Sequence, residues 1–160
     1  MKRIIIFFIF ICCGIHVFTQ EFDIRWIDDM SRYIGKHIRD IPDEYAQSTS
    51  DRNNFSRKLS NNIEEGFSVE NNNIVSVIWA KVINSRSLQY SEFDKLVTIF
   101  NDRFGKQLFE NDYGILWNWN SKPLMVIINS NIVGVSLSLP EFIGITQEQW
   151  NQVIEELSKR

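Results

Sequence analysis

The chain has 160 residues, with 17 Lys and Arg, 20 Asp and Glu, and a formal net charge of −3. This acidic balance excludes the positive patch by which proteins bind nucleic acid or anionic lipid, since the longest basic runs are the dipeptides Arg57-Lys58 and Lys159-Arg160. The length suffices for one domain with its own hydrophobic core.

The first residues have the pattern of a secretory signal peptide. Lys2 and Arg3 precede an uncharged, mostly apolar run over residues 4–18, and polar residues follow it. That run is shorter than the ~20 residues that a membrane-spanning helix needs. We therefore predict a signal peptide at residues 1–19 and a single exported domain at residues 20–160, periplasmic or secreted from a bacterial cell.

Two other interpretations of this leader stay open. It could be an uncleaved membrane anchor, or Cys12 or Cys13 could carry a lipid; only then would the protein contact a membrane. Both cysteines of the chain lie in this segment. An exported domain that begins near Gln20 would therefore fold without a disulfide and would have no thiol nucleophile or cysteine metal ligand.

Helical periodicity opens the predicted domain. Apolar residues recur at spacings of three and four from Asp23 to Arg39, which predicts an amphipathic helix. Ile41-Pro42 ends this helix, because the residue before proline avoids helical geometry. The polar stretch over residues 42–54 predicts a mobile loop.

Strands and a second helix are expected next. Residues 55–60 and 63–69 predict strands, and residues 74–83 are apolar on both faces, which is typical of a central strand. Ser91 is the predicted N-cap of the second helix, and Gly105 is its predicted C-cap.

The C-terminal part predicts three more strands and a third helix. The strands are expected at residues 114–120, 124–130 and 132–139, and Thr146 with Gln149 forms a capping box before the helix. The expected fold class is α+β: an antiparallel sheet of about six strands with three helices mainly on one face.

Two stretches of the chain match each other. Asn73-Ile74-Val75-Ser76-Val77 is echoed by Asn131-Ile132-Val133-Gly134-Val135, and a capped helix follows each stretch. The match predicts a tandem repeat of one helix and three strands, followed by the C-terminal helix. Chance is the alternative, because short apolar motifs recur easily in a chain rich in Ile and Asn.

The stretch from Tyr90 to Leu139 combines a helix that ends in an aromatic residue and glycine, a strand that carries tryptophan, and a meander. This order resembles small exported bacterial domains built from tandem helix-plus-sheet units, such as the β-lactamase inhibitor proteins and the small lipoproteins of outer-membrane assembly. Those inhibitors have a helix pair in each repeat and disulfides, which this chain lacks. The resemblance implies a binding or assembly role.

The sequence offers few groups for catalysis. His37 is the one histidine beyond the leader, and no nucleotide-binding, metalloprotease or serine-hydrolase motif occurs. The carboxylate pairs Asp28-Asp29, Glu64-Glu65 and Glu155-Glu156 are adjacent residues that point in different directions, so we expect solvated surface there. We predict no enzyme activity, cofactor or metal site.

Residues 113–120 are the best candidate for binding. On a strand, Trp117 and Trp119 share one face, and Tyr113 lies at the start of the segment. The two indole rings would form an exposed platform for a sugar or a protein side chain, or they would belong to the core. Gly134, Ser136 and Ser138 form a flat face that is solvated or covered by a partner.

We therefore expect an exported, non-catalytic binding or assembly module. Its partner would be another envelope or extracellular protein, or a glycan, with Tyr113, Trp117 and Trp119 as the candidate binding residues. The alternatives are a membrane-tethered structural protein of the envelope and a small hydrolase that uses His37 or dispersed acids.

Overall fold

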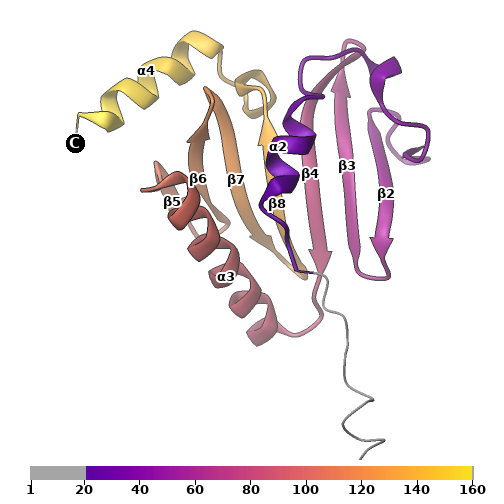
Figure 1. Ribbon diagram of the computed structural model, residues 1–160, viewed down its shortest axis with the longest axis horizontal. Helices are drawn as coiled ribbons and strands as arrows, with labels where there is room; N and C mark the ends of the chain where they lie inside the picture. The colour runs from indigo at the N-terminus through magenta and orange to yellow at the C-terminus, as the bar shows by residue number, and fades with distance from the viewer. Residues whose placement is uncertain (1–20, 160) are drawn as a thin grey trace, which may run out of the picture.

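The computed structural model describes residues 21–159, which form one open antiparallel sheet of eight strands in the order β1-β2-β3-β4-β8-β7-β6-β5 (Figure 1). Helices α2 (Arg25–Ser31) and α3 (Arg86–Phe104) cover one face, and α4 (Gln147–Ser158) lies at one end of the sheet. The predicted α+β class is confirmed. The predicted signal peptide at residues 1–19 lies outside the described residues.

Six of the strands match the prediction, and two short ones were missed. The predicted strands are β2 (Asn54–Ser60), β3 (Ile63–Glu70), β4 (Asn73–Val82), β6 (Gly114–Trp119), β7 (Lys122–Asn129) and β8 (Ile132–Ser138). The additional strands, β1 (Ala46–Gln47) and β5 (Phe109–Asn111), form the two edges of the sheet. Strand β1 pairs with β2, so residues 42–54 are not entirely the loop that was predicted.

The sheet is symmetric about the seam between β4 and β8. From the seam outward, the strands of one half are β4, β3, β2 and β1, and those of the other half are β8, β7, β6 and β5. A helix on the same face of the sheet precedes each half in the chain. Ile78 pairs with Ser136 in the middle of the seam, and these residues follow Asn73 and Asn131 at the same spacing. The two matching stretches are therefore the central strands, related by an approximate two-fold axis.

The first helix is shorter than predicted. Helix α2 ends at Ser31, whereas apolar spacing predicted a helix as far as Arg39. The chain turns at Gly35, which has a φ of 84° and donates its N–H to the Ile74 carbonyl at 2.8 Å. Pairing with β4 replaces the helical hydrogen bonds there, and the 3-10 helix η1 (Ile38–Asp40) follows.

The ends of the other two helices follow local sequence signals. Helix α3 begins after Ser85, earlier than the predicted cap at Ser91, and ends at Gly105 as predicted. The predicted capping box is confirmed. The Thr146 hydroxyl accepts from the Gln149 N–H at 3.1 Å, and the Gln149 side chain accepts from the Thr146 N–H at 2.8 Å.

The main core lies between the sheet and helices α2 and α3. Its fully buried members come from every central strand and from both helices. They include Ile27, Phe67, Val77, Leu96, Phe100, Trp117, Leu124 and Val135. Burying this apolar surface is the main favourable contribution to folding, because no cysteine occurs among residues 21–159.

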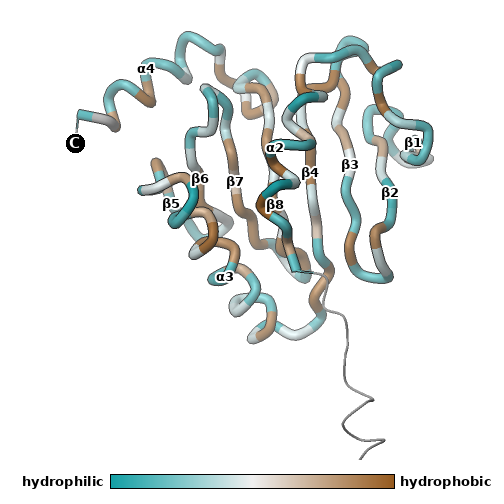
Figure 2. Tube along the Cα trace, in the orientation of Figure 1, coloured by the Kyte–Doolittle hydropathy of each residue, from teal (hydrophilic) through white to brown (hydrophobic). Residues whose placement is uncertain are grey.

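The C-terminal segment crosses to the opposite face of the sheet. Phe142, in the 3-10 helix η2 (Pro140–Ile143), lies beside Ile78 and Ala80 of that face. Helix α4 is mostly hydrophilic with separated hydrophobic residues (Figure 2), and its Trp150 is buried outside the main core. Within residues 21–159, no helix is both long and apolar enough to cross a membrane.

Candidate functional site

Of the two interpretations given for the tryptophans, the structure confirms the core interpretation at Trp117 and excludes the exposed platform there. Its side chain is 1% exposed and lies 5.3 Å from the ring of Phe100. Its indole N–H donates to the carbonyl of Gly105 at 3.1 Å and to the side chain of Asn101 at 3.3 Å. Trp117 therefore holds the C-terminal end of α3 against β6.

The other two predicted residues have different surroundings. Trp119 is half-buried against the same core, whereas Tyr113 is 71% exposed, in the turn between β5 and β6. The structure therefore does not bring the three residues together, because helix α3 covers the face that carries the tryptophans. Of the three, Tyr113 is exposed and Trp119 is partly accessible.

The face of the sheet opposite α2 and α3, here called the open face, is a second candidate surface. One row of paired residues on this face crosses all eight strands. No member of the row is charged. In spatial order the row is Ala46, Ser56, Gly66, Ile78, Ser136, Met125, Leu116 and Phe109.

Charge is confined to one end of the open face. In the neighbouring row, Lys58 pairs with Glu64 on β2 and β3, and uncharged residues continue across β4, β8, β7 and β6. Met125, Leu116 and Ile78 are partly exposed and Phe109 is 56% exposed, whereas Gly66 and Ser136 of the same row are buried. Open sheet faces in contact with water usually carry polar residues at alternate positions, whereas the part of this face on β5, β6 and β7 carries the apolar residues Phe109, Leu116 and Met125.

A hollow of about 500 Å³ lies on the β2–β4 half of the open face. Small residues of the strands, such as Gly66, Ser68 and Ala80, form its floor, and Phe142 forms part of its wall. Carboxylates lie at its margin, and no Lys or Arg lines it; these acidic residues include Asp51, Glu64 and Glu70. The hollow is therefore apolar at its floor and negative at its margin.

A buried carboxylate lies on the helix-covered face. Glu65 is 4% exposed, although we predicted solvated surface for Glu64-Glu65. Its carboxylate accepts hydrogen bonds from the Trp26 indole at 2.7 Å, the Tyr45 hydroxyl at 2.5 Å and the Arg57 guanidinium at 2.7 Å. The signal that could have found it is its alternation with Ile63 and Phe67, which places Glu65 on the buried face.

This network joins four parts of the chain: helix α2, the segment before β1, and strands β2 and β3. The Arg57 guanidinium lies 4.8 Å from the centroid of the Tyr45 ring and also pairs with Glu44 at 2.9 Å. Trp26, Tyr45 and Arg57 all donate to the Glu65 carboxylate, and Arg57 also donates to Glu44. We assign the network to stability.

Burial, followed by the hydrogen bond to Glu65 and its charge, raises the pKa of the Tyr45 hydroxyl above its ordinary value. A raised folded-state pKa gives a stability that is complete below the ordinary tyrosine pKa of about 10 and is lost as the pH rises above it. The free energy of unfolding of the wild type should therefore fall as the pH rises above about 10. In Tyr45→Phe this fall should be shallower, by up to about 1.4 kcal/mol per pH unit.

Urea denaturation followed by circular dichroism at a series of alkaline pH values measures this slope. Tyr113→Phe is the matched control, because Tyr113 is exposed and its loss should leave the slope unchanged. Equal slopes for the wild type and Tyr45→Phe would contradict the assignment.

The groups considered for catalysis and metal binding lie apart. His37 is exposed, and its Nδ1 accepts the Arg39 N–H at 3.1 Å as the cap of η1. Within residues 21–159, no three His, Cys, Asp or Glu side chains lie close enough together to hold a metal ion. No protein-family model, curated protein or solved structure matches this chain.

Proposed function

We propose that this chain is an exported, non-catalytic binding module that holds another envelope or extracellular protein against its open face. The observation that carries the proposal is the uncharged row of residues across the sheet, in which Phe109, Leu116 and Met125 form an accessible apolar stretch on three neighbouring strands. Soluble monomers rarely expose a continuous apolar surface of more than a few hundred Å² without a use for it.

The size of the open face suits a protein partner. The eight strands range from two residues in β1 to ten in β4, and with ~3.3 Å per residue and ~4.8 Å between strands they give a face of roughly 800 Å². A partner contributes about 800 Å² to an interface of standard size. The segment from η2 to Trp150 covers one end, and Ser76 and Ser138 of the face are buried, so the uncovered part is smaller than the whole face.

The residues of the open face indicate what kind of surface its partner would have. Phe109, Leu116 and Met125 would contact an apolar surface, and the hollow beside Phe142 would receive an apolar side chain. The acidic margin of the hollow favours a partner with a Lys or Arg at the corresponding position. The predicted signal peptide and the resemblance to exported inhibitor and assembly domains support this role.

Photo-crosslinking tests the proposal. A benzophenone amino acid at Ile78 or Leu116 on the open face should give one discrete adduct in the exported fraction, and the same group at Lys95 on α3 should give none. The mass of the adduct identifies the partner. An adduct between two copies of this chain would show that the open face binds a second copy instead of another protein. If neither open-face position gives an adduct, the proposal is refuted.

Negative charge introduced on the open face by substitution should weaken binding of the partner without unfolding the protein. We expect the double change Phe109→Asp and Met125→Asp to weaken the crosslinked complex at least tenfold, because a buried unpaired carboxylate opposes an apolar interface. Leu88→Asp is the matched control on α3, where the side chain is 64% exposed. Thermal unfolding of each variant should stay within a few degrees of the wild type; equal binding by the double variant would contradict the proposal.

A further inference from the structure

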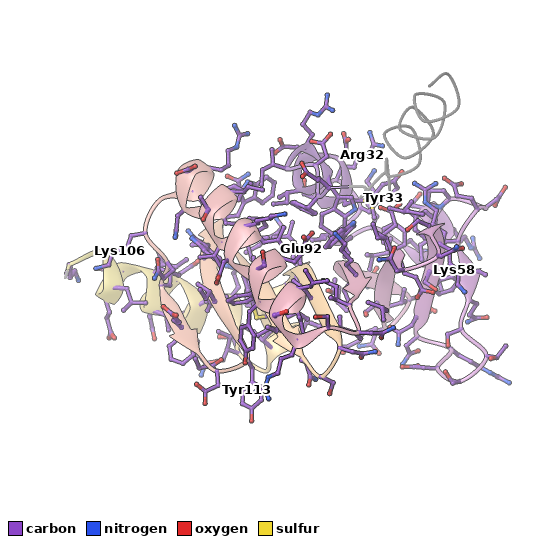
Figure 3. All side chains as sticks on the ribbon, turned by 90° about the horizontal axis from the view of Figure 1, so that it is seen from below. Arg32, Tyr33, Lys58, Glu92, Lys106 and Tyr113 are labelled. Carbon is purple, nitrogen blue, oxygen red and sulfur yellow. The ribbon has the colours of Figure 1, made fainter. Side chains whose placement is uncertain are left out.

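A second cavity lies at the end of the sheet where α3 begins. It has a volume of about 350 Å³ and is formed by three segments that are distant in sequence. These are the start of α3 with Gln89 and Tyr90, the β5–β6 turn with Asp112 and Tyr113, and the β7–β8 turn around Ser130. Figure 3 views the molecule from this end and shows Tyr113 projecting outward.

Backbone hydrogen bonds hold the three segments together. The Ile128 N–H donates to the Tyr113 carbonyl at 2.9 Å, and the Ile83 N–H donates to the Asn131 carbonyl at 2.7 Å. The Asn111 side chain accepts the Tyr113 N–H at 2.9 Å and closes the β5–β6 turn. The cavity therefore has a preformed wall, which lowers the entropy that a ligand must overcome on binding.

Two tyrosine rings are accessible in this cavity. Tyr90 is 47% exposed and Tyr113 is 71% exposed. The Arg86 guanidinium carbon lies 5.8 Å from the centroid of the Tyr90 ring, and an Arg86 N–H donates to the Tyr90 hydroxyl at 3.5 Å. Both rings therefore offer accessible apolar surface, and the Tyr90 ring lies beside a guanidinium that can form hydrogen bonds.

Gln89 is a buried polar side chain of the cavity wall. It is 3% exposed, and its amide nitrogen donates to the Ile132 carbonyl at 3.1 Å. Within residues 21–159, no donor reaches its side-chain oxygen, and the Asn84 and Asp112 side chains have no hydrogen-bond partner. The cavity thus contains several free acceptors and donors around two aromatic rings.

We propose that this cavity binds one or two rings of a neutral saccharide. The C–H faces of a sugar ring pack on tyrosine rings. Adjacent sugar hydroxyls form hydrogen bonds with amide, carboxylate and guanidinium groups, which are planar. The volume of this cavity lies at the small end of the range of volumes that ligand-binding pockets have. A proline-rich peptide, the other ligand that aromatic surfaces select, needs an extended groove.

Nuclear magnetic resonance titration of the exported protein tests this site. The probes are cellotetraose, chitotriose and maltotriose, each raised to about 20 mM, since a short sugar site is expected to have a millimolar Kd. We expect at least one of them to shift the backbone amides of Asn84, Tyr113 and Ser130 in a saturable manner. Shifts in other regions should be much smaller.

Variants separate this site from the open face. Tyr113→Ala should weaken saccharide binding at least tenfold, whereas Tyr113→Phe should retain most of it because the ring remains. Leu88→Ala, on an exposed residue of α3 outside the cavity, should have no effect. Phe109→Asp with Met125→Asp should also leave saccharide binding unchanged, so failure of the two proposals can be distinguished.

Three results would overturn the saccharide site. One is the absence of cavity shifts with all three oligosaccharides at about 20 mM. Another is unchanged binding by Tyr113→Ala. The third is saturable cavity shifts with a proline-rich peptide but with none of the sugars, which would assign the cavity to peptide recognition.

Discussion

Replacing Trp117 by alanine is expected to lower the free energy of unfolding by about 3–5 kcal/mol. The indole is 1% exposed and lies against Phe100, so the change leaves a cavity beneath α3. The change also removes the N–H that reaches the Gly105 carbonyl at the end of that helix. Such a loss is a large part of the 5–15 kcal/mol that typically stabilises a domain.

Urea denaturation followed by far-ultraviolet circular dichroism measures this effect. Trp119→Ala is the matched control: its indole is half-buried on the same face, and we expect a cost of about 1–2 kcal/mol. Trp117→Phe should fall between the wild type and Trp117→Ala, because it keeps a ring but loses the hydrogen bond. A cost below about 1 kcal/mol for Trp117→Ala would contradict its place in the core.

Replacing Arg57 by methionine is expected to cost about 2–4 kcal/mol. The change leaves the carboxylate of Glu65, whose side chain is 3% exposed, without its positively charged partner. Trp26 and Tyr45 remain as neutral hydrogen-bond donors. The cost should stay below that of breaking a fully buried pair, because the Arg57 side chain is 37% exposed and water screens its charge.

Two further variants test the cause of this loss. Glu44→Gln removes the exposed partner of Arg57 and should change stability by no more than about 0.5 kcal/mol. Adding Glu65→Leu to Arg57→Met should recover part of the lost stability, because no buried charge then remains without a partner. If the double variant is less stable than the sum of the single changes, the network is not governed by the unpaired charge.

Much of the architecture could be predicted from short-range patterns. The alternation around Phe67 on β3, the continuous apolar run of β4 and the capping box at Thr146 are local signals, and each matches an observed element. The Asn-rich segment between β3 and β4 forms a turn, and two of its residues, Asn71 and Asn72, have positive φ. Backbone sterics determine these features within a few residues.

Elements that depend on distant partners were missed or misplaced. Strands β1 and β5 are too short to show a period, and they exist because β2 and β6 offer free backbone groups at the sheet edges. Helix α2 is short because Gly35 and Lys36 bond to Ile74. Glu65 was expected in water, since nothing local shows that Arg57 and Tyr45 meet it.

The sequence by itself determined the α+β class, the central strands and the alternation of side chains along each strand. It also determined that Trp117 and Trp119 share a face, since successive side chains on a strand point to opposite sides. Only the tertiary structure decided which face α3 covers, because packing between distant segments makes that choice. That decision placed Trp117 in the core, left Phe109, Leu116 and Met125 on the face without α3, and brought Tyr90 and Tyr113 to one cavity.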